Sequence, residues 1–213
     1  MTDELEKLSW LFDTNDVVLK KTNASKDLLS IVGPSGVGKT ALARILEDYS
    51  SKFYVVPNVT TREKRSSDFE FHFEYVSESE FLKMLERGDF FAARVGGSPC
   101  YGYKKTDIKN ALSNNRICVF MFRYSGLKFF SKNFKNFKTV YLTSKAEIIS
   151  SRSLDAHKRQ TKSLTIEMQT KSEEVVIGLE EKGLSVLRFT NNYSGEEELK
   201  GMASAIIRQF YDH

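Results

Sequence analysis

Short apolar runs alternate with longer amphipathic segments along most of this 213-residue chain. The short runs are typical of buried strands, and segments with apolar residues at every third or fourth position are typical of helices with one buried face. The predicted strands are Leu28–Val32, Phe53–Val56, Ile117–Phe122, Thr139–Leu142 and Ser185–Phe189. The predicted helices are Lys39–Tyr49, Glu78–Arg87, Lys104–Ser113, Ser125–Ser131, Lys145–Ser151, Thr165–Lys182 and Gly195–Tyr211. This alternation predicts an α/β fold with a parallel core sheet.

Two regions depart from the alternation. Near the start, Glu4–Phe12 carries apolar residues at near-helical spacing, which predicts an N-terminal helix docked against the body of the protein. The polar, aromatic-rich stretch Asn58–Tyr103 contains the alternating residues Phe69, Phe71 and Phe73, and it predicts a small inserted subdomain with short strands. No internal repeat or interdomain linker is recognisable, so we expect a single domain over residues 1–213.

The most specific motif is GPSGVGKT at residues 33–40, which follows the first predicted strand and opens the first predicted helix. A phosphate-binding P-loop requires this context. Its glycines let the backbone curl around phosphate oxygens, so that successive N–H groups and a helix N-terminus face the anion. Lys39 is expected to reach the β- and γ-phosphates, and Thr40 to ligate Mg²⁺. The residues expected to hold ATP are Gly33, Ser35, Gly36, Val37, Gly38, Lys39, Thr40 and Ala41.

Composition narrows the class of protein. The chain has 32 Lys and Arg against 28 Asp and Glu, and its net charge of +4 suits anionic small molecules but falls well short of a nucleic-acid signature. Cys100 and Cys118 are too few for a disulfide framework, and the three histidines are scattered, so we expect no structural metal. No apolar stretch reaches membrane-spanning length and no signal-like segment opens the chain, so we expect a cytoplasmic protein without a membrane partner.

Further motifs follow the P-loop in a fixed order, namely Thr60-Thr61-Arg62, Phe73-Glu74-Tyr75-Val76-Ser77, Glu80-Phe81 and Tyr101-Gly102. With them, the chain resembles the guanylate kinases from about the first core strand to the C-terminus. The resemblance implies a P-loop three-layer sandwich with a parallel core sheet, an acceptor-binding subdomain at residues 58–103 and a lid at residues 152–165. Residues 1–24 would then be an N-terminal extension. The resemblance also implies phosphoryl transfer from ATP with Mg²⁺.

The resemblance assigns several residues to the acceptor. Arg62 and Arg65 match two family arginines that grip the acceptor phosphate, and a pair of guanidinium forks suits a phosphate dianion. Tyr101 matches a tyrosine that hydrogen-bonds the same phosphate. Asn58 and Tyr103 are also expected in the acceptor site. Phe73, by contrast, stands where the family has its other phosphate-binding tyrosine, so one hydroxyl donor is missing.

The guanine-reading positions differ from the family pattern. Ala92 stands where the family has a glutamate, and Tyr103 where it has a small hydroxyl residue. Met121 and Arg123 replace two acids of the strand that precedes Gly126. A site built on hydrogen bonds discriminates on the order of ten-thousandfold, so the loss of these acceptors argues against efficient use of GMP. Arg123 either faces an anionic acceptor or is a surface residue at a strand end.

The predicted lid is the least family-like part of the chain. Arg152 and Arg159 are expected to act in catalysis with the P-loop lysine, but the family's glycine-rich lid motif is not recognisable. Gln169 falls near the position of another family arginine. Lys158 and Lys162 either substitute for that arginine or belong to a solvated basic loop, and we favour the loop.

A basic, aromatic segment follows the strand Ile117–Phe122. Residues 123–138 hold no acid, and cations alternate there with Phe129, Phe130, Phe134 and Phe137. Basic residues interleaved with aromatics bind RNA or an acidic partner in some proteins. The interpretation that we favour is an amphipathic helix and loop with its phenylalanines in the core, and we expect no nucleic-acid partner.

Three functions fit these residues. The leading interpretation is an ATP-dependent phosphotransferase that acts on a small phosphate-bearing acceptor other than GMP. The second is a guanylate or other nucleoside monophosphate kinase with altered base contacts. The third is an ATP-binding regulatory or interaction module with a degenerate kinase site, and the intact P-loop counts against it.

Overall fold

Five parallel strands form the core sheet. The computed structural model describes residues 9–12, 27–66, 68–96, 99–134, 137–154, 162–192 and 195–211. Its core strands lie in the order β10-β9-β2-β8-β3, and all pairs are parallel. They are β2 (Leu28–Val32), β3 (Phe53–Val55), β8 (Ile117–Phe122), β9 (Lys138–Thr143) and β10 (Val186–Thr190). The predicted parallel α/β sheet is therefore confirmed, and the bounds of β2 and β8 are those expected from the sequence.

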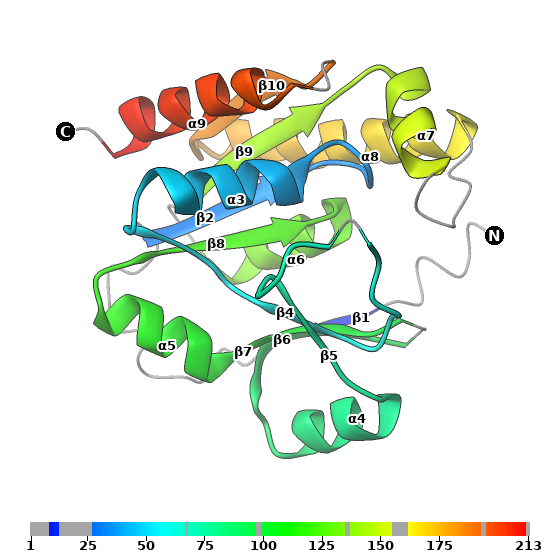
Figure 1. Ribbon diagram of the computed structural model, residues 1–213, viewed down its shortest axis with the longest axis vertical. Helices are drawn as coiled ribbons and strands as arrows, with labels where there is room; N and C mark the ends of the chain where they lie inside the picture. Colours follow the sequence, from blue (N-terminus) through cyan, green and yellow to red (C-terminus); the bar gives the residue numbers. More distant parts are fainter. Residues whose placement is uncertain are drawn as a thin grey trace.

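Helices cover both faces of this sheet, which makes three layers (Figure 1). On one face, α3 (Lys39–Tyr49), α7 (Ala146–Leu154) and α9 (Glu196–Phe210) contribute to one hydrophobic cluster. On the other face, a second cluster takes residues from α5 (Lys105–Ser113), α6 (Tyr124–Asn133) and α8 (Lys162–Glu180). Strand β2 divides its side chains between the clusters, with Leu29 and Ile31 in the first and Leu28 and Val32 in the second. Period-two alternation thus produces a strand that is buried on both sides.

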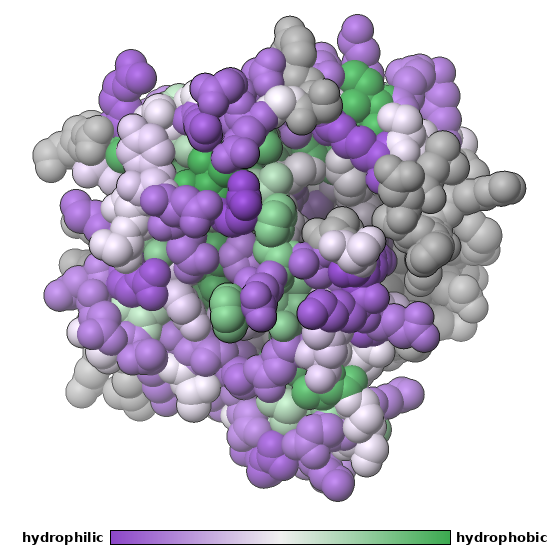
Figure 2. All heavy atoms as spheres, in the orientation of Figure 1, coloured by the Kyte–Doolittle hydropathy of each residue, from purple (hydrophilic) through white to green (hydrophobic). Residues whose placement is uncertain are grey.

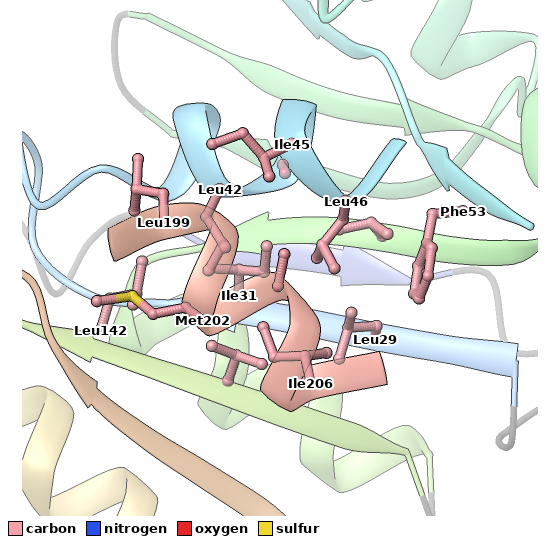
Figure 3. Close-up of a cluster of buried hydrophobic side chains, with 14 of the residues drawn as sticks. Leu29, Ile31, Leu42, Ile45, Leu46, Phe53, Leu142, Leu199, Met202 and Ile206 are labelled. Carbon is pink, nitrogen blue, oxygen red and sulfur yellow. The ribbon is translucent and has the colours of Figure 1, made fainter. Parts of the chain in front are cut away.

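The packing on the first face follows helical periodicity. Helix α3 buries Leu42, Ile45 and Leu46 against the sheet, and α9 lays Leu199, Met202 and Ile206 beside them (Figure 3). Residues three and four apart share one side of a helix, so each of these two helices presents a continuous apolar stripe. This cluster fixes the start of α3, and with it the end of the P-loop.

A second sheet lies beside the core sheet and holds most of the predicted inserted region. Its strands lie in the order β1-β6-β7-β4-β5. They are β1 (Ser9–Phe12), β4 (Asn58–Thr60), β5 (Phe73–Tyr75), β6 (Phe90–Val95) and β7 (Tyr101–Lys104). Helix α4 (Glu78–Glu86) packs on this sheet through Phe81 and Met84, and the ring of Phe81 stacks on that of Phe90 at 4.6 Å. The region thus has a small core of its own.

Two predictions in and near this sheet were wrong. Residues 9–12 belong to a strand, β1, that pairs antiparallel with β6, and not to a helix. Residues 1–8 lie outside the described residues. The alternation from Phe69 to Phe73 does not make a strand either, because β5 begins only at Phe73 and Phe71 has a left-handed backbone with φ of 67°. An edge strand is stabilised by its neighbour, which local spacing does not reveal.

The surface seen from the side of Figure 1 is predominantly polar. Purple spheres prevail among its coloured atoms, and green patches are limited in extent (Figure 2). None of the helices in the described part of the chain is long and apolar enough to cross a membrane.

One buried phenol joins the two sheets. Val56, which directly follows β3, donates its backbone N–H to the carbonyl of Val119 in β8 at 3.1 Å. Two residues further, the Tyr103 hydroxyl donates to the carbonyl of Met121 at 2.8 Å and accepts from the Met121 N–H at 3.2 Å. The hydroxyl therefore satisfies the backbone of β8 where β3 has ended. Burial raises the pKa of this phenol well above its ordinary value, so it remains protonated.

We predict that Tyr103→Phe destabilises the protein by about 1–3 kcal/mol, because it leaves a buried N–H and carbonyl without a partner. Urea unfolding followed by circular dichroism measures the loss. Tyr49→Phe is the matched control, since Tyr49 is 58% exposed. Equal stability of the Tyr103→Phe variant and the wild type would contradict the assigned role.

Candidate functional site

The predicted phosphate-binding residues lie at the carboxyl edge of the core sheet. The P-loop follows β2, Arg123 follows β8, Ser144 follows β9 and Asn191 follows β10. In open α/β sheets, this edge is where ligands bind. The loop and the strand ends are next to one another here because neighbouring parallel strands end on the same side.

Two P-loop glycines are required by close backbone contacts. Gly33 has φ of 156°, and a Cβ atom on it would lie 2.4 Å from the carbonyl oxygen of Leu142. Gly38 has φ of 104° and precedes the first turn of α3, and a Cβ there would lie 2.5 Å from Nδ2 of Asn191. Any other residue would collide at both positions. The loop is therefore pressed against β9 and β10, and its conformation depends on them.

Asn191 is a site residue that sequence reasoning missed. Its side chain is buried and donates from Nδ2 to the carbonyl of Val37 at 2.8 Å. Its own N–H bonds the carbonyl of Thr143 at 2.8 Å. Asn191 therefore ties the ends of β9 and β10 to the P-loop. The pair Asn191-Asn192 after a predicted strand was the only available signal, and it is weak, because asparagines are common in loops.

The side chain of Lys39 lies along its own loop. Nζ donates to the carbonyls of Gly33 at 2.8 Å and Pro34 at 2.7 Å. Burial, and secondarily the nearby charge of Arg123, lowers the pKa of Lys39 from 10.5 to about 7. At neutral pH this amine is thus close to the midpoint of its titration, and an entering anion would favour its charged form.

The other residues predicted to hold ATP differ in how far they are exposed to solvent. Val37 is fully buried in the first core cluster, so only its backbone can face a ligand. Ser35, Thr40 and Ala41 are partly buried, and Gly36 is exposed. The first turn of α3 contains no acidic residue. The helix N-terminus therefore keeps its positive end available for an anion.

Arg62 is held by a carboxylate. Its guanidinium forms a two-pronged pair with Asp68, at 2.7 Å for each bond, and also donates to the carbonyl of Glu63 at 2.8 Å. It lies 4.5 Å from the centre of the Phe73 ring. Although burial opposes the charged form, Arg62, the Tyr75 hydroxyl and the Arg65 N–H together lower the pKa of Asp68 to about 2. Asp68 therefore orients Arg62 and neutralises it.

Arg65, Arg123 and Tyr101 are close enough for their charges to interact. Arg123 is exposed at the end of β8. Desolvation by its surroundings, and secondarily the charge of Arg65, lowers the pKa of its guanidinium, whereas Tyr101 acts in the opposite direction. Neither arginine forms an ion pair with an acid among the residues that the structure describes. The structure thus brings together three residues that the sequence placed in the acceptor site.

Tyr103 and Asn58 are buried. Tyr103 is fully enclosed, with its ring edge-on to Phe120 at 5.1 Å and to Phe122 at 5.7 Å. Asn58 is also buried, and Ala92 packs in the same cluster as Tyr103. The hydroxyl of Tyr103 is occupied by the Met121 backbone, and a contact between this side chain and the acceptor stays a prediction.

The structure describes only part of the predicted lid, at residues 152–154 and 162–165. Arg152, in the last turn of α7, donates to the carbonyl of Asn191 at 3.3 Å, so it lies beside the residue that holds the P-loop. Arg159 and Lys158 lie outside the described residues. Lys162 forms an exposed ion pair with Glu147, and Gln169 donates to the carbonyl of Ser144. These last two contacts connect α8 to α7 and to β9.

The basic, aromatic segment is a helix and loop packed on the core. Phe130 and Phe137 are fully buried, and Phe129 and Phe134 pack against the same cluster. The interpretation favoured from the sequence is confirmed for these four phenylalanines.

We predict that Asp68→Asn lowers stability by about 2 kcal/mol at pH 7, since a pKa depressed by nearly two units corresponds to about that much. The carboxylate stabilises the fold above its unfolded pKa of 3.8, and this contribution disappears as the pH falls through 2. In urea unfolding, the gap between variant and wild type should therefore shrink between pH 4 and 2. Asp89→Asn, which breaks a surface pair with Arg87, is the control and should cost less than about 1 kcal/mol. A pH-independent gap would refute the assignment.

Comparisons with known proteins agree with this architecture. The chain is 31% identical over 128 residues to the guanylate kinase of Helicobacter pylori, which covers 60% of this chain and 62% of that protein. It is 33% identical over 120 residues to the guanylate kinase of Bartonella henselae, which covers 55% of this chain and 53% of that protein. The chain thus spans only about half to three fifths of the length of these curated relatives.

The fold comparison extends further along the chain. The crystal structure of guanylate kinase from Anaplasma phagocytophilum matches 87% of this chain and 84% of its own, with a TM-score of 0.58 and 14% identity, which shows a shared fold. The family model for guanylate kinase matches residues 25–185. Because that match covers most of the sequence, the chain belongs to the guanylate kinase family.

Proposed function

We propose that this chain is an ATP-dependent phosphotransferase whose acceptor carries a phosphate and is not GMP. The observation that carries the proposal is the position of Arg123, which directly follows Phe122, the register partner of Val32 at the start of the P-loop. Its charge acts on Lys39 of the P-loop and interacts with Arg65 and Tyr101 of the predicted acceptor site. Triphosphate and acceptor phosphate would therefore meet in one cleft, as in-line transfer requires.

The P-loop has the features needed for the triphosphate. Its cradle accepts only glycine at residues 33 and 38, and the first turn of α3 contains no acid. Lys39 would neutralise the β- and γ-phosphates, and Thr40 would hold Mg²⁺ together with phosphate oxygens and water. In the described residues, no cluster of three His, Cys, Asp or Glu side chains offers another metal site. Bound Mg²⁺ would supply further neutralisation of the transferred phosphate.

On the acceptor side, Arg65 and Tyr101 would contact the phosphate, with Arg62 oriented by Asp68. Arg62 is almost neutralised by that pair, so Arg65 carries the net charge at this point. Arg152 approaches the P-loop through Asn191, and it would stabilise the charge that develops on the transferred group. Arg159 is assigned the same role from its position in the predicted lid.

The positions that read guanine in the family argue against GMP. Ala92 offers no side-chain acceptor, and Tyr103 fills the adjacent space as a packed core residue. The Tyr103 hydroxyl is occupied by the backbone of Met121. A guanine base would lose its hydrogen-bonding partners at these positions, which is costly in a buried site.

A second candidate is a nucleoside monophosphate kinase with altered base contacts. The observation in its favour is that the similar curated relatives are guanylate kinases with 31–33% identity. Relocated contacts to another base would reconcile this similarity with the lost acids.

The test is an assay of ADP release across nucleoside monophosphates and sugar phosphates, with and without Mg²⁺. We expect Mg²⁺-dependent turnover with a phosphorylated acceptor other than GMP, and at least about a thousandfold less in Lys39→Ala. Activity concentrated on GMP would exclude our proposal in favour of a guanylate kinase. ATP binding without turnover of any acceptor would support a regulatory module instead.

The lowered pKa of Lys39 gives a second prediction, which concerns proton uptake. The free amine is mostly neutral above pH 7, whereas bound triphosphate favours the ammonium form. Binding of a non-hydrolysable ATP analogue at pH 8 should therefore take up close to one proton, and affinity should fall by up to about tenfold per unit as the pH rises above 7. Calorimetry in buffers of different ionisation enthalpy measures the uptake. Lys39→Ala should abolish it, and the same uptake in that variant would contradict the assignment.

A further inference from the structure

Arg94 is a cation at the acceptor site that the sequence did not single out. It lies on β6 directly opposite Tyr101 of β7. Its guanidinium is 4.7 Å from the centre of the Tyr101 ring, and Nη2 donates to the carbonyl of Pro99 at 2.9 Å. Its Nε is buried and has no hydrogen-bond partner among the described residues. The side chain is thus held in place with donor capacity left unused.

Arg94 lies on the side of the second sheet that meets the end of β8. The Tyr103 hydroxyl contacts Met121 of β8, and two residues from that contact on each strand stand Tyr101, opposite Arg94, and Arg123. The pKa of Arg94 is lowered by burial and then by the charge of Arg123. Arg123 interacts in the same way with Arg65, and it also lowers the pKa of Lys39. We call Lys39, Arg65, Arg94 and Arg123 the cation cluster. Like charges at short range repel, so their accumulation has a cost that an anionic ligand would relieve.

The protein does not balance this cluster with its own acids. The carboxylate at the acceptor site, Asp68, is engaged by Arg62 and Tyr75. Within the part of the chain that the structure describes, no acid forms an ion pair with Arg94 or Arg123. The anions of the proposed reaction account for only part of the cluster, since the triphosphate would engage Lys39 and the acceptor phosphate would engage Arg65 with Tyr101. Neither of these two anions would engage Arg94 or Arg123.

The same strands limit the acceptor that this face could take. Ala92 and Arg94 share a face of β6, and their register partners Tyr103 and Tyr101 share a face of β7. The Ala92–Tyr103 end is closed, because both residues are fully buried against Phe120 and Phe122. The Arg94–Tyr101 end is only partly buried. An acceptor on this face would therefore be blocked at Ala92 and Tyr103 and would meet cations at the Arg94 end.

We propose that Arg94 and Arg123 form a second anion subsite, and that the acceptor is a compact molecule with a carboxylate or phosphate in addition to its first phosphate. This inference rests on the proposed function for the identity of the site. In place of a base recognised by hydrogen bonds, the acceptor would carry a second charged group recognised by these two arginines. A guanidinium group can bind either a carboxylate or a phosphate. Because its N–H donors lie in one plane, Arg94 would bind the second anion in the plane of its guanidinium group.

Matched probes test the subsite by calorimetry without ATP. One pair is glycerol 3-phosphate and 3-phosphoglycerate, and the other is glucose 6-phosphate and glucose 1,6-bisphosphate, so that each pair differs in a second anionic group at short or long spacing. We expect the more anionic member of at least one pair to bind about tenfold more tightly to the wild type. That preference should fall to about twofold or less in Arg94→Ala and be partly retained in Arg94→Lys, which keeps the charge. Arg87→Ala, at an exposed pair on α4, should leave it unchanged.

The outcomes separate the subsite from the activity. Equal binding within both pairs by the wild type, or a preference that survives in Arg94→Ala, overturns the second subsite, even if the chain phosphorylates a singly charged acceptor. A preference lost in Arg94→Ala supports the subsite, even if no ADP is released with any acceptor, in which case the proposed function alone fails. Thermal unfolding of both Arg94 variants verifies that they fold.

Discussion

The contact between the Tyr103 hydroxyl and the Met121 backbone is the constraint on which the position of the second sheet depends. It attaches β7 to β8 at the point where β3 no longer covers the edge of the core sheet. Because the bond is buried and uses both the donor and an acceptor lone pair of one phenol, it fixes the position of the second sheet closely. The phenol also occupies space beside Ala92. In the proposed site, the same side chain would therefore contribute to stability and limit the size of the acceptor.

The charges near the P-loop and the facing part of the second sheet divide into a balanced pair and an unbalanced cluster. Arg62 and Asp68 neutralise each other over two bonds of 2.7 Å, and each side chain is only 9% exposed. This pair contributes to the fold. Lys39, Arg65, Arg94 and Arg123 form no such pair with an acid in the residues described. An arginine identified from its motif alone would be assigned to the ligand in both cases, and only the geometry separates the two roles.

The sequence predicted the core more completely than the periphery, for physical reasons. Strands β2 and β8 are buried on both faces and helix α3 has one apolar stripe, so local patterns determine them. The P-loop was predictable because its glycines and its lysine carry the chemistry within eight consecutive residues. Strand β1 was not, since its pairing partner β6 lies about eighty residues away. Asn191 and Arg94 were missed for the same reason, as each acts through a partner on another strand or loop.

Asn191 connects the two ends of the predicted triphosphate site. The side chain of Asn191 donates to the carbonyl of Val37 in the P-loop, and the backbone carbonyl of Asn191 accepts from Arg152 of α7. Gly38 can approach Asn191 only because it lacks a Cβ. A shift of α7 would therefore act on the residue that sets the P-loop conformation, and a shift of the P-loop would act on Arg152. Since Arg152 begins the predicted lid, these contacts link the P-loop to the end of α7, the helix from which that predicted segment continues.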